Sequence, residues 1–71
     1  MINTQRPLDI LGKAINTNVT VYLKDGSVVK GILKAYDIHI NIVLENAKFN
    51  KEDREFQMIV IRGDNIQFVS L

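Results

Sequence analysis

The chain has 71 residues, enough for one domain, and 46% of them are hydrophobic, which is ordinary for a folded protein. It contains no cysteine and a single histidine, which excludes disulfides, thiolate metal sites and a histidine cluster for zinc. The net charge of +1 excludes the broad basic excess of a non-specific duplex binder. A core this small rarely contributes more than about 3–5 kcal/mol of stability, so we expect oligomerisation to bury additional surface. We expect no cofactor and no metal.

Residues 6–14 are expected to form a short N-terminal helix. Pro7 suits the first helical turn, where its missing N–H costs nothing, and Leu8, Leu11 and Ile15 fall on one apolar stripe. The polar residues before this segment do not resemble a signal peptide, and no stretch approaches the roughly 20 apolar residues of a membrane span. We therefore expect a cytoplasmic protein that does not enter a membrane, with a helix lying over a sheet.

The next part of the chain predicts a hairpin of two strands. Residues 18–24 alternate between apolar and polar side chains, as a half-buried strand does. Asp25-Gly26 follows as a tight hairpin signal, because glycine tolerates the positive φ of such turns. A second strand is expected over residues 27–36, where Gly31 predicts a sharp bend or bulge. A long strand bent in its middle can serve both halves of a small barrel.

The C-terminal part predicts the remaining strands. The run 42–44 is apolar, and residues 48–55 are polar and charged, as in a variable loop. We expect a fourth strand over 56–61 and a fifth over 66–71, separated by a tight turn. Residues 58–61 are apolar on both faces, so the second face needs a cover. Pairing with a neighbouring copy would supply it and would remove an exposed apolar edge.

Two polar turns carry the candidate binding residues: Asp37, His39, Asn41, Arg62, Gly63 and Asp64. The flat imidazole of His39 and the planar guanidinium of Arg62 can each stack on a base. Asn41 has donor and acceptor groups suited to reading a base edge. Gly63 allows a tight turn and close approach, and Asp64 could hold Asn41 or the N–H groups of its own turn.

The motifs around these turns resemble the Sm-like (LSm) family of archaeal type. Residues 18–46 resemble the first Sm motif, including Asp37-Ile38-His39-Ile40-Asn41 and the apolar run after it. Residues 56–71 resemble the second Sm motif through Ile61-Arg62-Gly63-Asp64-Asn65. The resemblance covers almost the whole chain, and the second signature is far more selective than a lone glycine motif. The chain is thereby identified as a single Sm domain.

This resemblance implies a mostly β fold, in which a short N-terminal α-helix precedes a strongly bent five-stranded antiparallel barrel of SH3-like or OB-like arrangement. It implies a homo-oligomeric ring, usually of seven subunits, formed through the fourth and fifth strands; paralogous Sm-like subunits are further partners. It also implies binding of uridine-rich single-stranded RNA at the central pore, for RNA processing, stability or ribonucleoprotein assembly. By the same resemblance His39 and Arg62 sandwich a base, Asn41 reads its edge, Asp64 supports that contact and Asp37 supports the loop.

Two other functions are compatible with parts of the sequence. A structural ring without RNA, or a small peptide-binding barrel of SH3 type, shares the expected architecture. The chain has no tryptophan and few aromatic residues for a peptide groove. For catalysis, Asp37 and His39 resemble two members of a triad without a third, so we predict no catalytic residues and no enzymatic activity.

Overall fold

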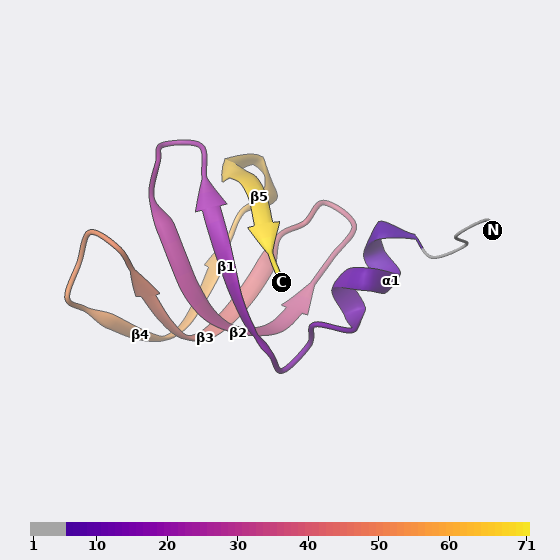
Figure 1. Cartoon of the computed structure of the whole chain (residues 1–71), viewed down its shortest axis with the longest axis horizontal. Helices are drawn as coiled ribbons and strands as arrows, with labels where there is room; N and C mark the ends of the chain where they lie inside the picture. The colour runs from indigo at the N-terminus through magenta and orange to yellow at the C-terminus, as the bar shows by residue number, and fades with distance from the viewer. Residues whose placement is uncertain (1–5) are drawn as a thin grey trace.

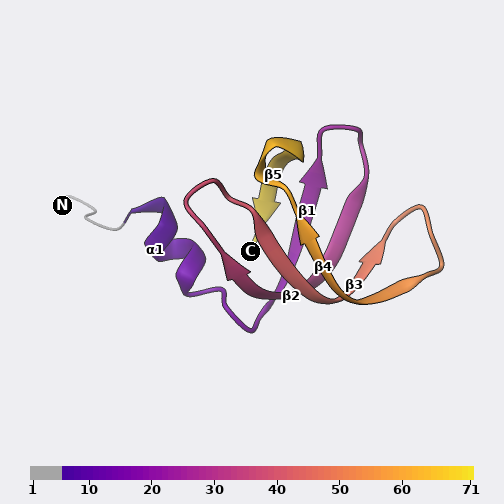
Figure 2. The same cartoon turned by 180° about the vertical axis from the view of Figure 1, so that it is seen from behind.

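The computed structural model describes residues 6–71, which form one short helix followed by strands (Figure 1). The elements in chain order are α1 (Pro7–Gly12), β1 (Asn18–Leu23), β2 (Val28–Tyr36), β3 (Ile42–Phe49), β4 (Glu55–Ile61), the 3-10 helix η1 (Gly63–Asn65) and β5 (Ile66–Ser70). The helix expected over 6–14 is thus shorter at both ends. The loop expected over 48–55 narrows to 50–54, because the end of β3 pairs with β2 on one side and with the start of β4 on the other (Figure 2).

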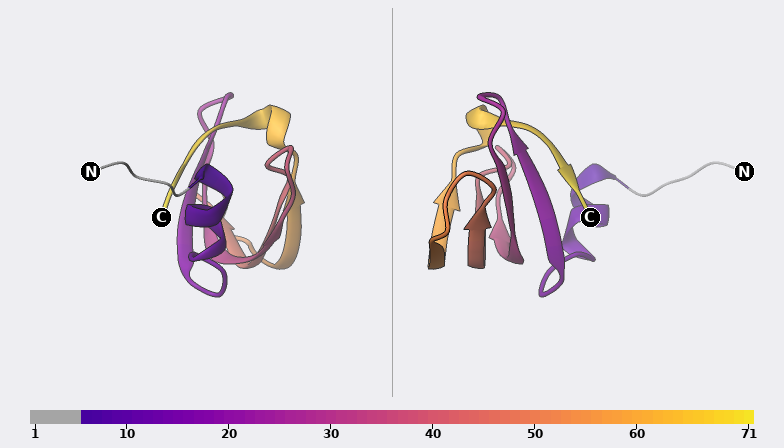
Figure 3. Two further views of the ribbon diagram at one scale, coloured as in Figure 1. Left: turned by 90° about the vertical axis from the view of Figure 1, so that its right-hand side faces the viewer. Right: turned by 60° about the vertical axis from the view of Figure 1, so that its left-hand side comes forward.

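The five strands form one antiparallel sheet in the order β4-β3-β2-β1-β5. The sheet curls around a single core, with α1 at one open end of the curl (Figure 3). Its two edges are β4 and β5, each hydrogen-bonded to one neighbour within the described residues. The predicted fold class, a helix followed by a bent five-stranded antiparallel sheet, is confirmed.

The bend of β2 occurs at Gly31, as the sequence predicts. The register between β2 and β3 shifts between Lys30 and Ile32, and a Cβ at Gly31 would lie 3.1 Å from the carbonyl oxygen of Glu45 and 3.2 Å from the Cα of Ala47. These contacts are tighter than ordinary van der Waals packing. The absence of a side chain at Gly31 therefore lets the backbone of β3 lie close to the bend in β2. The hairpin turn at Gly26 also has the expected positive φ of 91°.

Apolar side chains from α1, the turn after it and strands β1 to β4 fill the core, and β5 packs two partly buried residues, Ile66 and Val69, against it. The ten buried hydrophobic residues are Leu11, Ala14, Val19, Val21, Val29, Leu33, Ile42, Leu44, Ala47 and Ile61. The helix is fixed to the sheet by Tyr36, whose hydroxyl donates a hydrogen bond of 3.0 Å to the carbonyl of Leu8. Gly12 makes room for that hydroxyl, since a Cβ there would lie 2.7 Å from it. The end of β2 therefore carries the helix on one side and leads into the 37–41 turn.

The two edge strands expose apolar side chains. On β4, Met58 and Val60 are 53% and 68% exposed, whereas Ile61 is buried. On β5, Phe68 is 52% exposed, and its ring stacks on Tyr22 with a centroid distance of 4.3 Å. The prediction that the fourth strand is apolar on both faces is confirmed. Among residues 6–71, no helix has the length and apolar character needed to cross a membrane.

Candidate functional site

An open pocket of about 450 Å³ lies where the β2–β3 turn meets the β4–β5 turn. It is lined by five of the six residues that the sequence singled out: His39, Asn41, Arg62, Gly63 and Asp64. The sixth, Asp37, contacts Asn41 rather than the pocket. The two turns are adjacent because β3 pairs with β4, so that Ile42 at the start of β3 lies opposite Ile61 at the end of β4. The pairing of β3 with β4 thus brings together Asn41 and Gly63, which are 22 residues apart in the chain.

The carboxylate of Asp37 organises the first turn. Its Oδ1 accepts hydrogen bonds from the backbone N–H groups of His39 at 2.9 Å and Asn41 at 3.1 Å. Its Oδ2 accepts a hydrogen bond of 3.0 Å from Nδ2 of Asn41. The side-chain bond from Asn41, followed by the two backbone bonds, lowers the pKa of Asp37 below its ordinary value of 3.8. The carboxylate therefore stays ionised, and stays an acceptor, at neutral pH.

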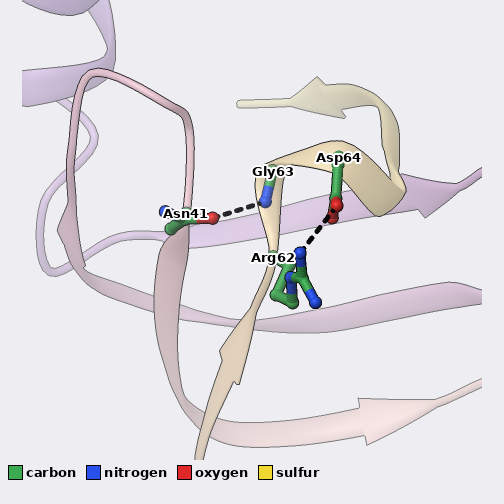
Figure 4. Close-up of polar contacts among 4 residues, drawn as sticks. All are labelled: Asn41, Arg62, Gly63 and Asp64. Carbon is green, nitrogen blue, oxygen red and sulfur yellow. Dashed lines mark hydrogen bonds and ion pairs between the residues drawn. The ribbon is translucent and has the colours of Figure 1, made fainter.

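Asn41 connects the first turn to the second. Its Oδ1 accepts a hydrogen bond of 2.8 Å from the N–H of Gly63, drawn in Figure 4. Gly63 packs against the backbone of His39 so closely that a Cβ at this position would overlap the His39 carbonyl group. The close approach that the sequence assigned to Gly63 is thus made to the protein's own backbone. The two turns form one unit through these contacts.

The second turn carries an ion pair. Nη2 of Arg62 lies 2.9 Å from Oδ2 of Asp64, and the two side chains are 75% and 61% exposed (Figure 4). Such an exposed pair adds little to stability, about 0–1 kcal/mol, but it restricts the guanidinium at the mouth of the pocket. The sequence predicts that Asp64 holds Asn41 or the N–H groups of its own turn, and the structure corrects this prediction. The carboxylate that holds Asn41 is instead Asp37, and Asp64 holds Arg62.

The backbone of Ile40 is in an unusual conformation, with φ of 59°. Left-handed φ is rare for a β-branched residue, and strain of this kind costs about 1–3 kcal/mol and is typical of functional sites. The half-buried Ile40 side chain packs against the core, while His39 beside it is exposed in the pocket. The sequence held no signal for this conformation, since Asn and Gly are the residues that usually mark it.

The pocket offers chemistry for holding a planar, polar ligand. His39 and Arg62 supply two flat groups, and Asn41 and the backbone supply hydrogen-bonding groups. Within residues 6–71, no three His, Cys, Asp or Glu side chains gather closely enough to hold a metal ion. A nucleobase matches this combination, because its faces stack and its edge carries donors and acceptors.

Comparison with known proteins gives the family. The profile of the LSM domain matches residues 9–71. The crystal structure of the SmAP (LSm) protein from Methanococcus vannielii is 68% identical, with a TM-score of 0.89 and coverage of 99% of this chain and 100% of that one. The Pyrococcus abyssii Sm protein, solved in complex with a uridine heptamer, is 40% identical, with a TM-score of 0.86 over 93% of this chain and 97% of that one. A heptameric archaeal Sm protein is 33% identical, with a TM-score of 0.79 over 86% and 93% of the two chains. The chain therefore belongs to the LSM (Sm-like) family.

Proposed function

We propose that this protein is the RNA-binding subunit of a homo-oligomeric ring, of seven copies, that binds uridine-rich single-stranded RNA at its central pore. The observation that carries the proposal is the pocket in which His39, Asn41 and Arg62 converge from two turns. The uridine heptamer bound to the Pyrococcus abyssii relative supports the choice of ligand. RNA processing, stability or ribonucleoprotein assembly in the cytoplasm would be the cellular role.

In this proposal one base enters each pocket. His39 and Arg62 hold its two faces, and stacking on such groups is worth about 1–3 kcal/mol per base. Asn41 reads the base edge, and Gly63 supports it through the hydrogen bond from its N–H to Oδ1 of Asn41. Asp64 acts through Arg62, whose guanidinium it restrains at 2.9 Å. Asp37 acts through Asn41 and the backbone of the first turn. A net charge of +1 leaves most of the affinity to these local contacts.

The ring would form by strand pairing between copies. The two edges of the sheet, β4 and β5, belong to the same chain and carry exposed apolar side chains, so the β5 edge of one copy can pair with the β4 edge of the next. A head-to-tail contact of this kind closes into a ring when the rotation per copy is right. It also removes two exposed edges that would otherwise favour aggregation. The heptameric archaeal relative supports the number seven.

Native mass spectrometry with fluorescence anisotropy tests the proposal. The protein should form a single species of seven copies that takes up an oligouridine strand in preference to oligocytidine. His39→Ala combined with Arg62→Ala should weaken oligouridine binding more than about tenfold while the ring survives. Arg54→Ala is the matched control, because it removes the same charge from a side chain over the ring of Phe56, away from the pocket. An intact ring that does not bind RNA would favour the alternative of a purely structural ring. Equal affinity of the double variant and the Arg54→Ala control for oligouridine would exclude this pocket as the binding site.

A further inference from the structure

We infer that two of the proposed rings stack face to face, through a charged groove at the end of the sheet opposite α1. The inference rests on the ring that the proposed function includes, and it names a further partner, a second ring of the same chain. It starts from an open groove of about 570 Å³ that lies apart from the RNA pocket. The charged side chains that line this groove are Lys30, Lys48, Glu52, Asp53 and Glu55.

The charged groove has a positive half and a negative half. Lys30 on β2 lies directly opposite Lys48 on β3, and Lys48 lies opposite Glu55 at the start of β4. The other two carboxylates belong to the 50–54 loop that joins β3 to β4. The charge of the groove therefore changes from positive on β2 and β3 to negative on β4 and the loop.

The charges of the groove are not paired within one copy. All five side chains are exposed, and among residues 6–71 the only ion pair within 4.0 Å joins Arg62 to Asp64. Like charges directly opposite each other destabilise a pair of strands, and Lys30 lies between Lys48 and Thr20 in the sheet. No carboxylate faces Lys30 across either neighbouring strand. A partner that brings carboxylates to the two lysines would therefore stabilise the groove.

A second copy of the same groove matches this charge pattern. A two-fold rotation places the positive half of one groove against the negative half of the other, and the reverse contact forms at the same time. A phosphate backbone matches it less well, because carboxylates outnumber lysines in the groove and repel phosphate. The partner that fits the groove is therefore another copy of this chain.

The position of the groove makes that partner a whole ring. The 50–54 loop lies at the end of the molecule opposite α1 (Figure 1), whereas ring formation uses the β4 and β5 edges. Rotation about the ring axis repeats the groove on every copy, with the same orientation along the axis. One exposed ion pair is weak and is screened by salt, but grooves that engage together around two facing rings bind multivalently.

Reversal of the charges tests the pairing of the two halves. Lys30→Glu with Lys48→Glu makes the whole groove negative. Glu52→Lys with Asp53→Lys and Glu55→Lys makes the whole groove positive. Each variant alone should form single rings, because like charges would meet in a double ring. A mixture of the two preassembled variants should form double rings, because opposite charges meet again.

Lys13→Glu with Lys34→Glu is the matched control for the lysine variant. It makes the same change of charge at two exposed lysines near the other end of the molecule. Lys13 is the C-cap of α1, and Lys34 donates a hydrogen bond of 2.8 Å to the side chain of Asn16, just beyond that helix. Neither lysine lines the charged groove. The control should therefore stack as the wild type does.

Sedimentation velocity measures the assembly of each protein at low salt and at about 1 M salt, where charges are screened beyond about 3 Å. We expect the wild type and the control to sediment at low salt with twice the mass of one ring, and at high salt as single rings. Single rings of the wild type at low salt would overturn the inference and leave the proposed ring intact. A mixture of the reversed variants that stays as single rings would also overturn it, and so would a control that loses the double ring. Single copies of the wild type would overturn the proposed ring itself, and this inference with it.

Fluorescence anisotropy with oligouridine separates stacking from RNA binding. The lysine variant and the control carry the same charge, so we expect their affinities for oligouridine to agree within about threefold. A larger loss in the lysine variant would assign Lys30 and Lys48 to RNA and overturn the inference. If a reversed variant does not assemble into rings, Lys30→Gln with Lys48→Gln provides the comparison, since it removes the positive half of the groove and should also give single rings.

Discussion

Replacing Gly63 with alanine is the sharpest single test of how the two turns work together. The added Cβ would overlap the carbonyl of His39 and lie 2.9 Å from the carbonyl carbon of Ile40, so the turns must separate. Separation breaks the 2.8 Å bond from the Gly63 N–H to Asn41, worth about 1 kcal/mol, and overpacking adds about 1–3 kcal/mol. We expect the variant to lose roughly 2–4 kcal/mol of stability and most of its affinity for oligouridine.

Gly26→Ala controls for this experiment. Gly26 has a positive φ of 91°, so alanine there should cost about 1–2 kcal/mol, but nothing lies within 4 Å of the added Cβ. Urea unfolding gives the stability of each variant, and fluorescence anisotropy gives its affinity for oligouridine. The control should be destabilised and still bind. If the two alanine variants bind oligouridine equally well, the contact between the turns does not organise the pocket and our reasoning is refuted.

Three further outcomes are expected. Val60→Lys places a charge on the exposed face of the β4 edge and should shift the native mass spectrum from rings to single copies; intact rings would contradict assembly through β4. Leu33→Ala removes a fully buried side chain and should lower the free energy of unfolding by about 2–5 kcal/mol, with a smaller loss contradicting the assigned core. In a carboxyl NMR titration the midpoint of Asp37 should fall below 3.8, because its hydrogen bonds stabilise the ionised form. The stability contributed by that carboxylate is therefore present above about pH 4 and is lost as pH falls through the lowered pKa.

The sequence predicts most of the fold because each strand has a local signal. The alternation after Asn18, the Asp25-Gly26 turn and the bend at Gly31 are all properties of neighbouring residues, and all three are confirmed. The ends of elements depend on longer-range contacts. β3 continues to Phe49 and β4 begins at Glu55 because the two strands pair, which outweighs the polar composition of the segment.

The residues of the candidate site were predicted by type and motif, but their partners were not. The sequence predicts that Asp64 holds Asn41 or the N–H groups of its own turn, whereas in the structure Asp64 pairs with Arg62 and Asp37 holds Asn41, because the geometry of each turn decides the partners. An aspartate at the start of a turn does bond to N–H groups further along, so the hydrogen bond from His39 to Asp37 had a local signal. The left-handed φ of Ile40 had none, because tertiary packing imposes it against the preference of the residue.

The strand order has a consequence for folding. Hairpins join β1 to β2, β2 to β3 and β3 to β4, whereas β5 reaches β1 across the three strands that lie between them in the sequence. Closing that long loop costs more entropy than closing a hairpin, so β5 has the least local support of the five strands. A neighbouring copy paired along β5 would stabilise this strand most of all. Dilution of the assembled protein should therefore appear first as faster amide exchange in residues 66–70, before the hairpins respond.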